Sequence, residues 1–135
     1  MWEDADGFCP FAASVARLDP YQQAVLDACV THILAPMGIA VASTEWGKAL
    51  GQGLYELRIR RSLHAIRTWG LSDPPRASNP QERQPVLLRV FFTVHGDRVV
   101  LLFQAYDKGG DPSEKRQRKE IAEARKHLRA WRSSR

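Results

Sequence analysis

The stretch that decides the fold is Gly53-Leu54-Tyr55-Glu56-Leu57-Arg58-Ile59-Arg60, in which apolar and charged residues alternate. A period of two is the signature of a β-strand whose two faces meet different surroundings. One face carries the side chains of Tyr55, Leu57 and Ile59. The other carries Glu56, Arg58 and Arg60. The pattern therefore predicts a strand that packs on helices through one face and is polar on the other.

Two further strands are expected downstream. Residues 86–94 are apolar on both sides except for Arg89 and Thr93, so this strand should be central in a sheet. His95-Gly96-Asp97-Arg98 predicts a turn, and residues 99–106 then form the returning strand of a hairpin. The stretch 70–85 holds four prolines among Ser, Asn and charged residues, which predicts a mobile loop.

Helices are expected on both sides of these strands. Pro10 can open a short helix over residues 10–17. Asp19 is a plausible N-cap for the next helix, with Pro20 at its first position and Gln22 placed for a capping box; Pro36 and Gly38 should end it. A final helix should run from residue 112 or 113 to 131. Its apolar stripe consists of Ile121, Ala124, Leu128 and Trp131.

These elements predict one α+β domain over residues 1–135. N-terminal helices should pack on a mainly antiparallel, twisted sheet of three to four strands, with a basic helix at the C-terminus. The acidic start and the lack of about 18 consecutive apolar residues favour a cytoplasmic protein without a membrane partner. The two cysteines and four histidines show no spacing typical of a metal site.

Charge is distributed unevenly along the chain. Residues 1–50 carry a net charge of −4, whereas residues 108–135 carry +6. A strongly basic C-terminal part indicates a surface that meets a polyanion such as RNA, although a solvated basic helix would give the same composition.

Several segments resemble RelE/HigB-type toxins, close to the phage-derived HigB-like branch of the RelE/ParE superfamily. The resemblance runs in register over nearly the whole chain. It is carried by Asp6-Gly7-Phe8-Cys9-Pro10, Gly53-Leu54-Tyr55-Glu56-Leu57-Arg58, Leu88-Arg89-Val90-Phe91-Phe92, Val100-Leu101-Leu102-Phe103, Asp107-Lys108 with Pro112, and Glu120-Ile121-Ala122-Glu123-Ala124-Arg125. The chain departs from the family in three ways: Asp107-Lys108 stands for a Lys-Lys pair, the 70–85 insert is long, and the usual first strand is missing or reduced to a few residues.

The resemblance implies the toxin of a toxin–antitoxin module. Such a protein is a metal-independent endoribonuclease that cleaves messenger RNA at the ribosome, without a cofactor, and is silenced by a cognate helix-turn-helix antitoxin. Operator DNA would be contacted only through the antitoxin. Two other functions stay open: a ParE-like toxin that inhibits gyrase without cutting RNA, and a non-enzymatic nucleic-acid-binding module.

Metal-free RNA cleavage needs positioned cations for the charge that develops on the phosphate, and groups that move protons. Arg58 and Arg60 should project from one face, and Arg89 from a strand that pairs close by. Tyr106 and Lys108 lie where the last strand ends; the phenol can stack on a base or donate a proton. Asp107 is expected to orient an arginine rather than accept a proton, and Arg58 can alternatively pair with Glu56 or Asp107.

RNA affinity is expected from other cations, whose phosphate contacts would be independent of sequence. The candidates are Arg67, Lys115, Arg118, Lys119, Arg125 and Lys126. Two modes of antitoxin binding are open: an acidic segment laid over Arg58, Arg60 and Arg89, or binding to the helices that blocks entry to the ribosome. The acidic N-terminal third is not expected to bind RNA, which favours the second mode, with the antitoxin on the helices around residues 11–34.

Overall fold

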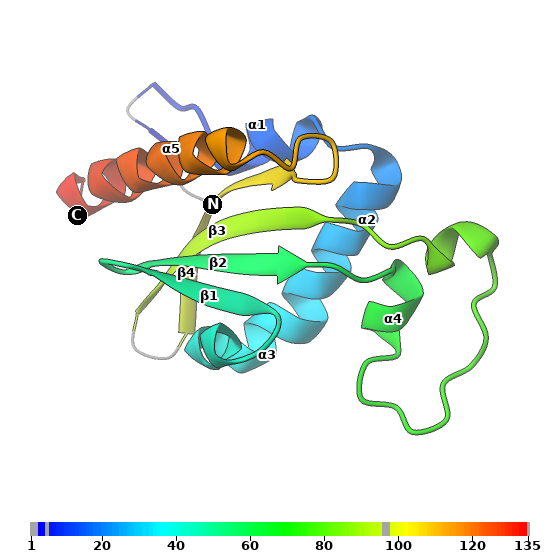
Figure 1. Cartoon of the computed structure of the whole chain (residues 1–135). Coiled ribbons are helices and arrows are strands. Elements are labelled where there is room, and N and C mark those ends of the chain that lie inside the picture. Colours follow the sequence, from blue (N-terminus) through cyan, green and yellow to red (C-terminus); the bar gives the residue numbers. More distant parts are fainter. Residues whose placement is uncertain (1–2, 5, 96–97, 135) are drawn as a thin grey trace.

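A four-stranded antiparallel sheet with strand order β1-β2-β3-β4 organises the molecule (Figure 1). This computed structural model describes residues 3–4, 6–95 and 98–134. The strands are β1 Gly47–Gly51, β2 Leu54–Ile59, β3 Leu88–His95 and β4 Arg98–Asp107. The helices are α1 Pro10–Ala16, α2 Pro20–Cys29, α3 Ala35–Met37, α4 Leu63–Arg67 and α5 Glu114–Ser133. The expected α+β architecture is confirmed.

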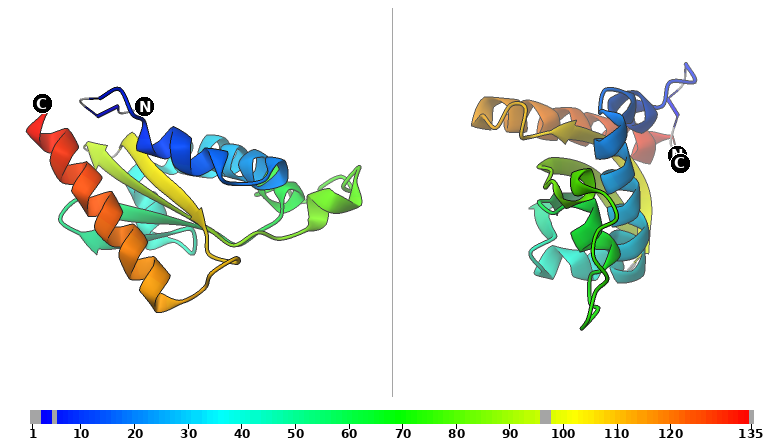
Figure 2. Two further views of the ribbon diagram at one scale, coloured as in Figure 1. Left: turned by 90° about the horizontal axis from the view of Figure 1, so that it is seen from above. Right: turned by 90° about the vertical axis from the view of Figure 1, so that its right-hand side faces the viewer.

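Helices cover both faces of the sheet. Figure 2 shows α5 crossing one face while α2 lies against the other. The larger apolar core lies on the α2 side and includes Leu26, Ile33, Leu57 and Phe92. The smaller one lies under α5. It is formed by Leu54, Phe91, Phe103, Tyr106, Ala124 and Leu128, with Ile121 and Trp131 packed against it. The predicted apolar stripe of the last helix therefore faces the sheet.

The N-terminal helical run begins where the sequence predicts and continues past Pro36. Asp19 accepts from the backbone N–H of Gln22, and the Gln22 side chain accepts from that of Asp19, which completes the capping box. Pro36 does not end the run, because a π-helical turn over Val30–Leu34 precedes it and α3 continues to Met37. Gly38, at φ +56°, ends the α-helical part, and a 3-10 helix over Gly38–Ser43 completes the run.

The helical run Pro20–Ser43 is long and apolar enough, by length and composition, to cross a membrane, and it is the one such segment in the described chain. Its apolar face packs on the sheet through Val25, Cys29 and Leu34, which are fully buried. The core helix of a soluble protein and a signal sequence meet the same criteria, so the segment is weak evidence for a membrane span.

The five-residue strand β1 was not among the strands expected from the sequence. β1 pairs with β2 through a hairpin whose turn, Gly51-Gln52-Gly53, has positive φ at all three residues. At the other edge of the sheet, α1 lies beside β4, where the Ser14 hydroxyl accepts from the backbone N–H of Ala105 at 3.0 Å. The expected turn at 95–98 includes residues 96 and 97, which lie outside the described residues; His95 and Arg98 pair across it.

The long insert between β2 and β3 has more structure than a loop. Before it, α4 begins at the Ser62 cap, a helix that the sequence interpretation did not include. Inside it, a 3-10 turn spans Pro80–Arg83, and Ser62 bridges to Pro85 at its end. An ion pair of 3.0 Å between Arg67 and Glu82 ties α4 to this turn. The mobility expected for residues 70–85 stays a prediction.

Candidate functional site

Three of the predicted site residues form one row across the sheet. Arg58 on β2 pairs directly with Arg89 on β3, and Arg89 pairs directly with Tyr106 on β4. Directly opposed residues of an antiparallel pair project from the same face. The row lies on the α5 side, since the neighbouring row contains Gln104, which bonds to Glu120 of α5. The expected convergence of Arg58 and Arg89 on one face is thus present.

A fully buried carboxylate holds the row together. Glu56 Oε1 accepts from Arg58 Nε at 2.9 Å and lies 3.8 Å from Arg89 Nε. Arg89 is 5% exposed, and burial lowers its pKa most, partly opposed by the nearby Glu56. A buried charge needs a partner of opposite sign, so Glu56 explains why an arginine is tolerated in a central strand. The polar face predicted for β2 is therefore not a solvent-exposed face.

The start of α5 closes over this cluster. Gln117 donates from Nε2 to Glu56 Oε2 at 3.3 Å and accepts from Lys108 Nζ at 2.9 Å. Lys108 is thereby joined to the arginine row through one amide side chain. Desolvation and the positive charge of Arg89 lower the pKa of Lys108.

Tyr106 is buried rather than placed at a rim. It is 2% exposed, and its ring lies between Phe91, stacked at 6.2 Å, and Arg116, 5.2 Å from the ring centroid. The expectation that Tyr106 can stack on a base is wrong, because neither face of its ring is open. Burial, followed by the charge of Glu56, raises the pKa of Tyr106 to about 12. Its hydroxyl stays protonated, and within the described part of the chain it has no hydrogen-bond partner.

Arg60 and Asp107 occupy different positions from the row. Arg60 is exposed beyond the end of β2 and donates to the Glu45 carbonyl at 3.0 Å. Asp107 pairs opposite Leu88 and therefore faces the α2 side. It accepts from Gln22 at 2.8 Å and from the backbone N–H of Gly110 at 3.1 Å. The expectation that Asp107 orients an arginine is wrong, as is its pairing with Arg58.

The predicted RNA-binding residues divide into free and engaged cations. Lys115, Lys119 and Lys126 are exposed on α5, and the exposed Arg118 lies 3.7 Å from Glu114. Arg125 instead donates to the carbonyls of Leu50 and Gly51 and so fastens α5 to the β1–β2 hairpin. Arg67 pairs with Glu82 on α4, away from α5. The structure does not bring Arg67 and Arg125 into one surface with the others.

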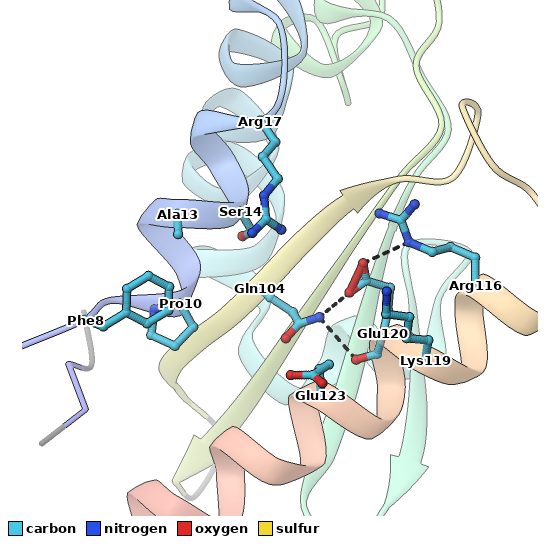
Figure 3. Close-up of a pocket in the computed structure, with 10 residues that line it drawn as sticks. All are labelled: Phe8, Pro10, Ala13, Ser14, Arg17, Gln104, Arg116, Lys119, Glu120 and Glu123. Atoms are coloured by element: carbon cyan, nitrogen blue, oxygen red, sulfur yellow. Dashed lines mark hydrogen bonds and ion pairs between the residues drawn. The ribbon is translucent and has the colours of Figure 1, made fainter. Parts of the chain in front are cut away.

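A cavity of about 380 Å³ lies between α1, β4 and α5 (Figure 3). Arg17 and Ser14 reach it from α1, Gln104 from β4, and Arg116 and Glu120 from α5. Glu120 accepts from Arg116 at 3.0 Å and from the Gln104 amide. Since these polar groups satisfy one another, the cavity has the character of a structural junction between the helices. The described residues contain no group of three or more His, Cys, Asp or Glu placed to hold a metal ion.

The sequence offered Glu56 only as a possible partner of Arg58, which the structure confirms, and missed Gln117. Glu56 shares a face of β2 with Arg58, but its burial depends on α5, which lies far along the chain. Gln117 could not be recognised as a site residue from the sequence, because one glutamine on a basic helix does not stand out from its neighbours. Comparison with known protein families, curated proteins and solved structures gave no match.

Proposed function

We propose that the protein is the toxin of a toxin–antitoxin module of the RelE/HigB type, a metal-independent endoribonuclease acting on messenger RNA at the ribosome. The observation that carries the proposal is the row Arg58–Arg89–Tyr106, which lies on one face of the sheet and is joined by Lys108. A helix that only bound nucleic acid would not need cations gathered over a buried carboxylate.

Each group has a chemical role in this proposal. Arg58, whose side chain is 27% exposed, contacts the scissile phosphate and stabilises the charge that develops on it. Arg89 lies deeper and reinforces the positive potential. Lys108, with its lowered pKa, accepts the proton of the ribose 2′-hydroxyl. Tyr106 is buried with its hydroxyl protonated, so it supports the row from within the core, and the leaving oxygen takes its proton from water.

The cleanest test is Arg58→Ala. Arg89→Ala would leave Glu56 buried without its deeper cation, whereas Arg58→Ala keeps the Glu56–Arg89 contact. Purified protein is incubated with ribosomes and a translated message, and new RNA ends are mapped. We expect Arg58→Ala to lose about 10²–10³-fold in rate, as when one charge-stabilising group is removed. Arg17→Ala, which removes an exposed arginine of the N-terminal helices, outside the predicted RNA surface, should cut at the parental rate.

Two results would contradict the proposal. A folded Arg58→Ala variant that cuts at the parental rate would show that the arginine row is not the catalytic site. A parent that leaves the message intact but inhibits gyrase-dependent supercoiling would establish the ParE-like function instead, because the two kinds of toxin share a fold.

The partner is proposed to be a helix-turn-helix antitoxin that binds the N-terminal helices, in the cytoplasm, and alone contacts operator DNA. A hollow of about 520 Å³ beside α3, lined by Val30, Leu34 and Met37, supports this placement. Amide hydrogen exchange on the purified complex should show protection over residues 11–34. Protection confined to β2 and β3 would show that the antitoxin covers the arginine row instead.

A further inference from the structure

An exposed tryptophan is held rigidly beyond the end of β2, where it takes no part in the core. Trp69 is 47% exposed, and its ring meets the edge of the buried Trp46 at 4.9 Å in a T-shaped contact of 84°. Its backbone N–H donates to Ile66 at 3.2 Å, and Gly70, at φ +85°, turns the chain back immediately after it. The indole is therefore a fixed surface.

One arginine lies over this indole, within a basic segment of the chain. The Arg61 guanidinium lies 5.5 Å from the Trp69 ring centroid and donates to Glu45 at 2.7 Å. Residues 58–83, which include α4 and most of the insert, carry a net charge of +4. Proteins bind single-stranded nucleic acids through aromatic side chains next to cations, so that a base stacks on the ring and phosphates contact the cations.

The indole is connected to the arginine row through one short segment. The Trp46 carbonyl accepts from the backbone N–H of Arg58 at 2.7 Å, and the Glu45 carbonyl accepts from Arg60 at 3.0 Å. Residues 45–46 thus contact Arg58, Arg60, Arg61 and Trp69 in turn. The Arg58 side chain faces α5, whereas Trp69 packs on Trp46 of the α2-side core, so RNA leaving the row would pass the exposed Arg60 at the end of β2 to reach the indole.

We propose that Trp69 and Arg61 form a stacking site for one unpaired base of the RNA whose scissile phosphate lies at the arginine row. The inference rests on the proposed function and names a contact that positions its substrate. The base takes the place of the Arg61 guanidinium on the ring. An exposed cation–π contact is worth only about 2- to 5-fold in an equilibrium, whereas stacking of one base is worth about 5- to 150-fold. The displaced guanidinium can then exchange its ion pair with Glu45 for a phosphate.

The test uses short single-stranded oligoribonucleotides that are 2′-O-methylated throughout, so that they bind without being cut. Trp69→Leu should weaken binding about 5- to 150-fold, and Trp69→Phe, which keeps a smaller ring, should recover part of the loss. Phe8→Leu is the matched control, since Phe8 is an equally exposed aromatic (50%) at the α1–α5 cavity. It should bind as the parent does.

A second measurement needs no variant. Single abasic positions are moved along the oligonucleotide, and we expect one position to weaken binding to the parent but not to Trp69→Leu. An abasic series without such a position, or Trp69→Leu binding RNA as the parent does, overturns the inference; the indole would then be a surface for a protein partner. Cleavage is scored separately on unmodified RNA. If Trp69-dependent binding occurs without cleavage, the stacking site stands and the proposed nuclease activity fails.

Discussion

Glu56 shows how one carboxylate determines the behaviour of two cations. It is fully buried, and its oxygens meet Arg58, Arg89 and Gln117. Removing a charge from water costs several kcal/mol unless partners compensate it. With two guanidiniums and one carboxylate, the cluster keeps an excess of positive charge. That excess is what an incoming phosphate would neutralise.

Glu56→Gln should therefore destabilise the protein strongly. The amide cannot balance the guanidinium of Arg89, and loss of one partner of a buried pair costs about 3–5 kcal/mol. Urea unfolding measures the difference. Glu45→Gln is the matched control, because Glu45 pairs with Arg61 at 2.7 Å but both side chains are more than 40% exposed. Its cost should stay below about 1 kcal/mol. Equal losses in the two variants would mean that Glu56 is not a buried anchor.

At the scale of single residues, the sequence predicted which side chains share a face but not, apart from a possible Arg58–Glu56 pair, which groups they contact. Arg89 was recognised as a charge in an apolar strand that needed an explanation, and the faces of β2 were assigned correctly. The explanation depends on register: Arg89 meets Glu56 because Arg58 and Arg89 are directly opposed. A shift of one residue would turn Arg89 to the other face, and no local pattern fixes that choice.

Among the elements, α5 has two distinct functions in the structure. Its apolar stripe packs on the sheet, and Arg125 fastens it to the β1–β2 hairpin through the carbonyls of Leu50 and Gly51. Lys115, Lys119 and Lys126 are exposed and lie within one side of the helix, at spacings of four and seven residues. These three lysines are the part of α5 that is free to meet RNA.

Reversing the three lysines to glutamate should weaken RNA binding and flatten its salt dependence. Each lost phosphate contact lowers the slope of log K against log salt by about 0.7 for a single strand, so the change should approach about 2. Binding titrations over a salt series measure it. Arg125→Ala should instead keep the slope and lower stability by about 1.5 kcal/mol, through its lost hydrogen bonds. An unchanged slope in the triple variant would mean that α5 points away from RNA.

Long elements with strong periodicity were predictable, and short ones were not. The α5 helix was expected to within two residues of each end, because its stripe and cap are local signals. The strand β1 has no alternation to detect: Gly47–Gly51 contains two glycines, Lys48 and Ala49, and it is a strand because β2 pairs with it. α4 is five residues long, and its single local signal was the cap at Ser62.

For the molecule as a whole, alkaline pH should reduce stability. Burial raises the pKa of Cys29 from 9.0 to about 12, and that of Tyr106 from 10.0 to about 12. The folded state therefore keeps protons that the unfolded chain releases. Stability is fully present below pH 9 and falls as pH rises towards 12, by about 1.4 kcal/mol per pH unit for each group.

Urea unfolding between pH 8 and 11 tests this expectation. Cys29→Ala should be less stable than the parent at pH 8, because it leaves a small cavity, yet should lose less stability on going to higher pH. A variant that follows the parental slope would show that the Cys29 thiol does not contribute to the alkaline loss.

The position of α1 beside β4 has a consequence for solubility. A terminal strand offers a row of unpaired backbone groups, on which a second molecule can add a strand and begin an aggregate. The Ser14 hydroxyl takes up one of these groups, the N–H of Ala105, and also donates to the Phe11 carbonyl, so the helix is hydrogen-bonded to the edge that it shields. The seven-residue helix α1 thus hinders the addition of a further strand at this edge. A chain that lacks α1 would retain most of its core, but we expect its molecules to aggregate through the exposed edge strand β4.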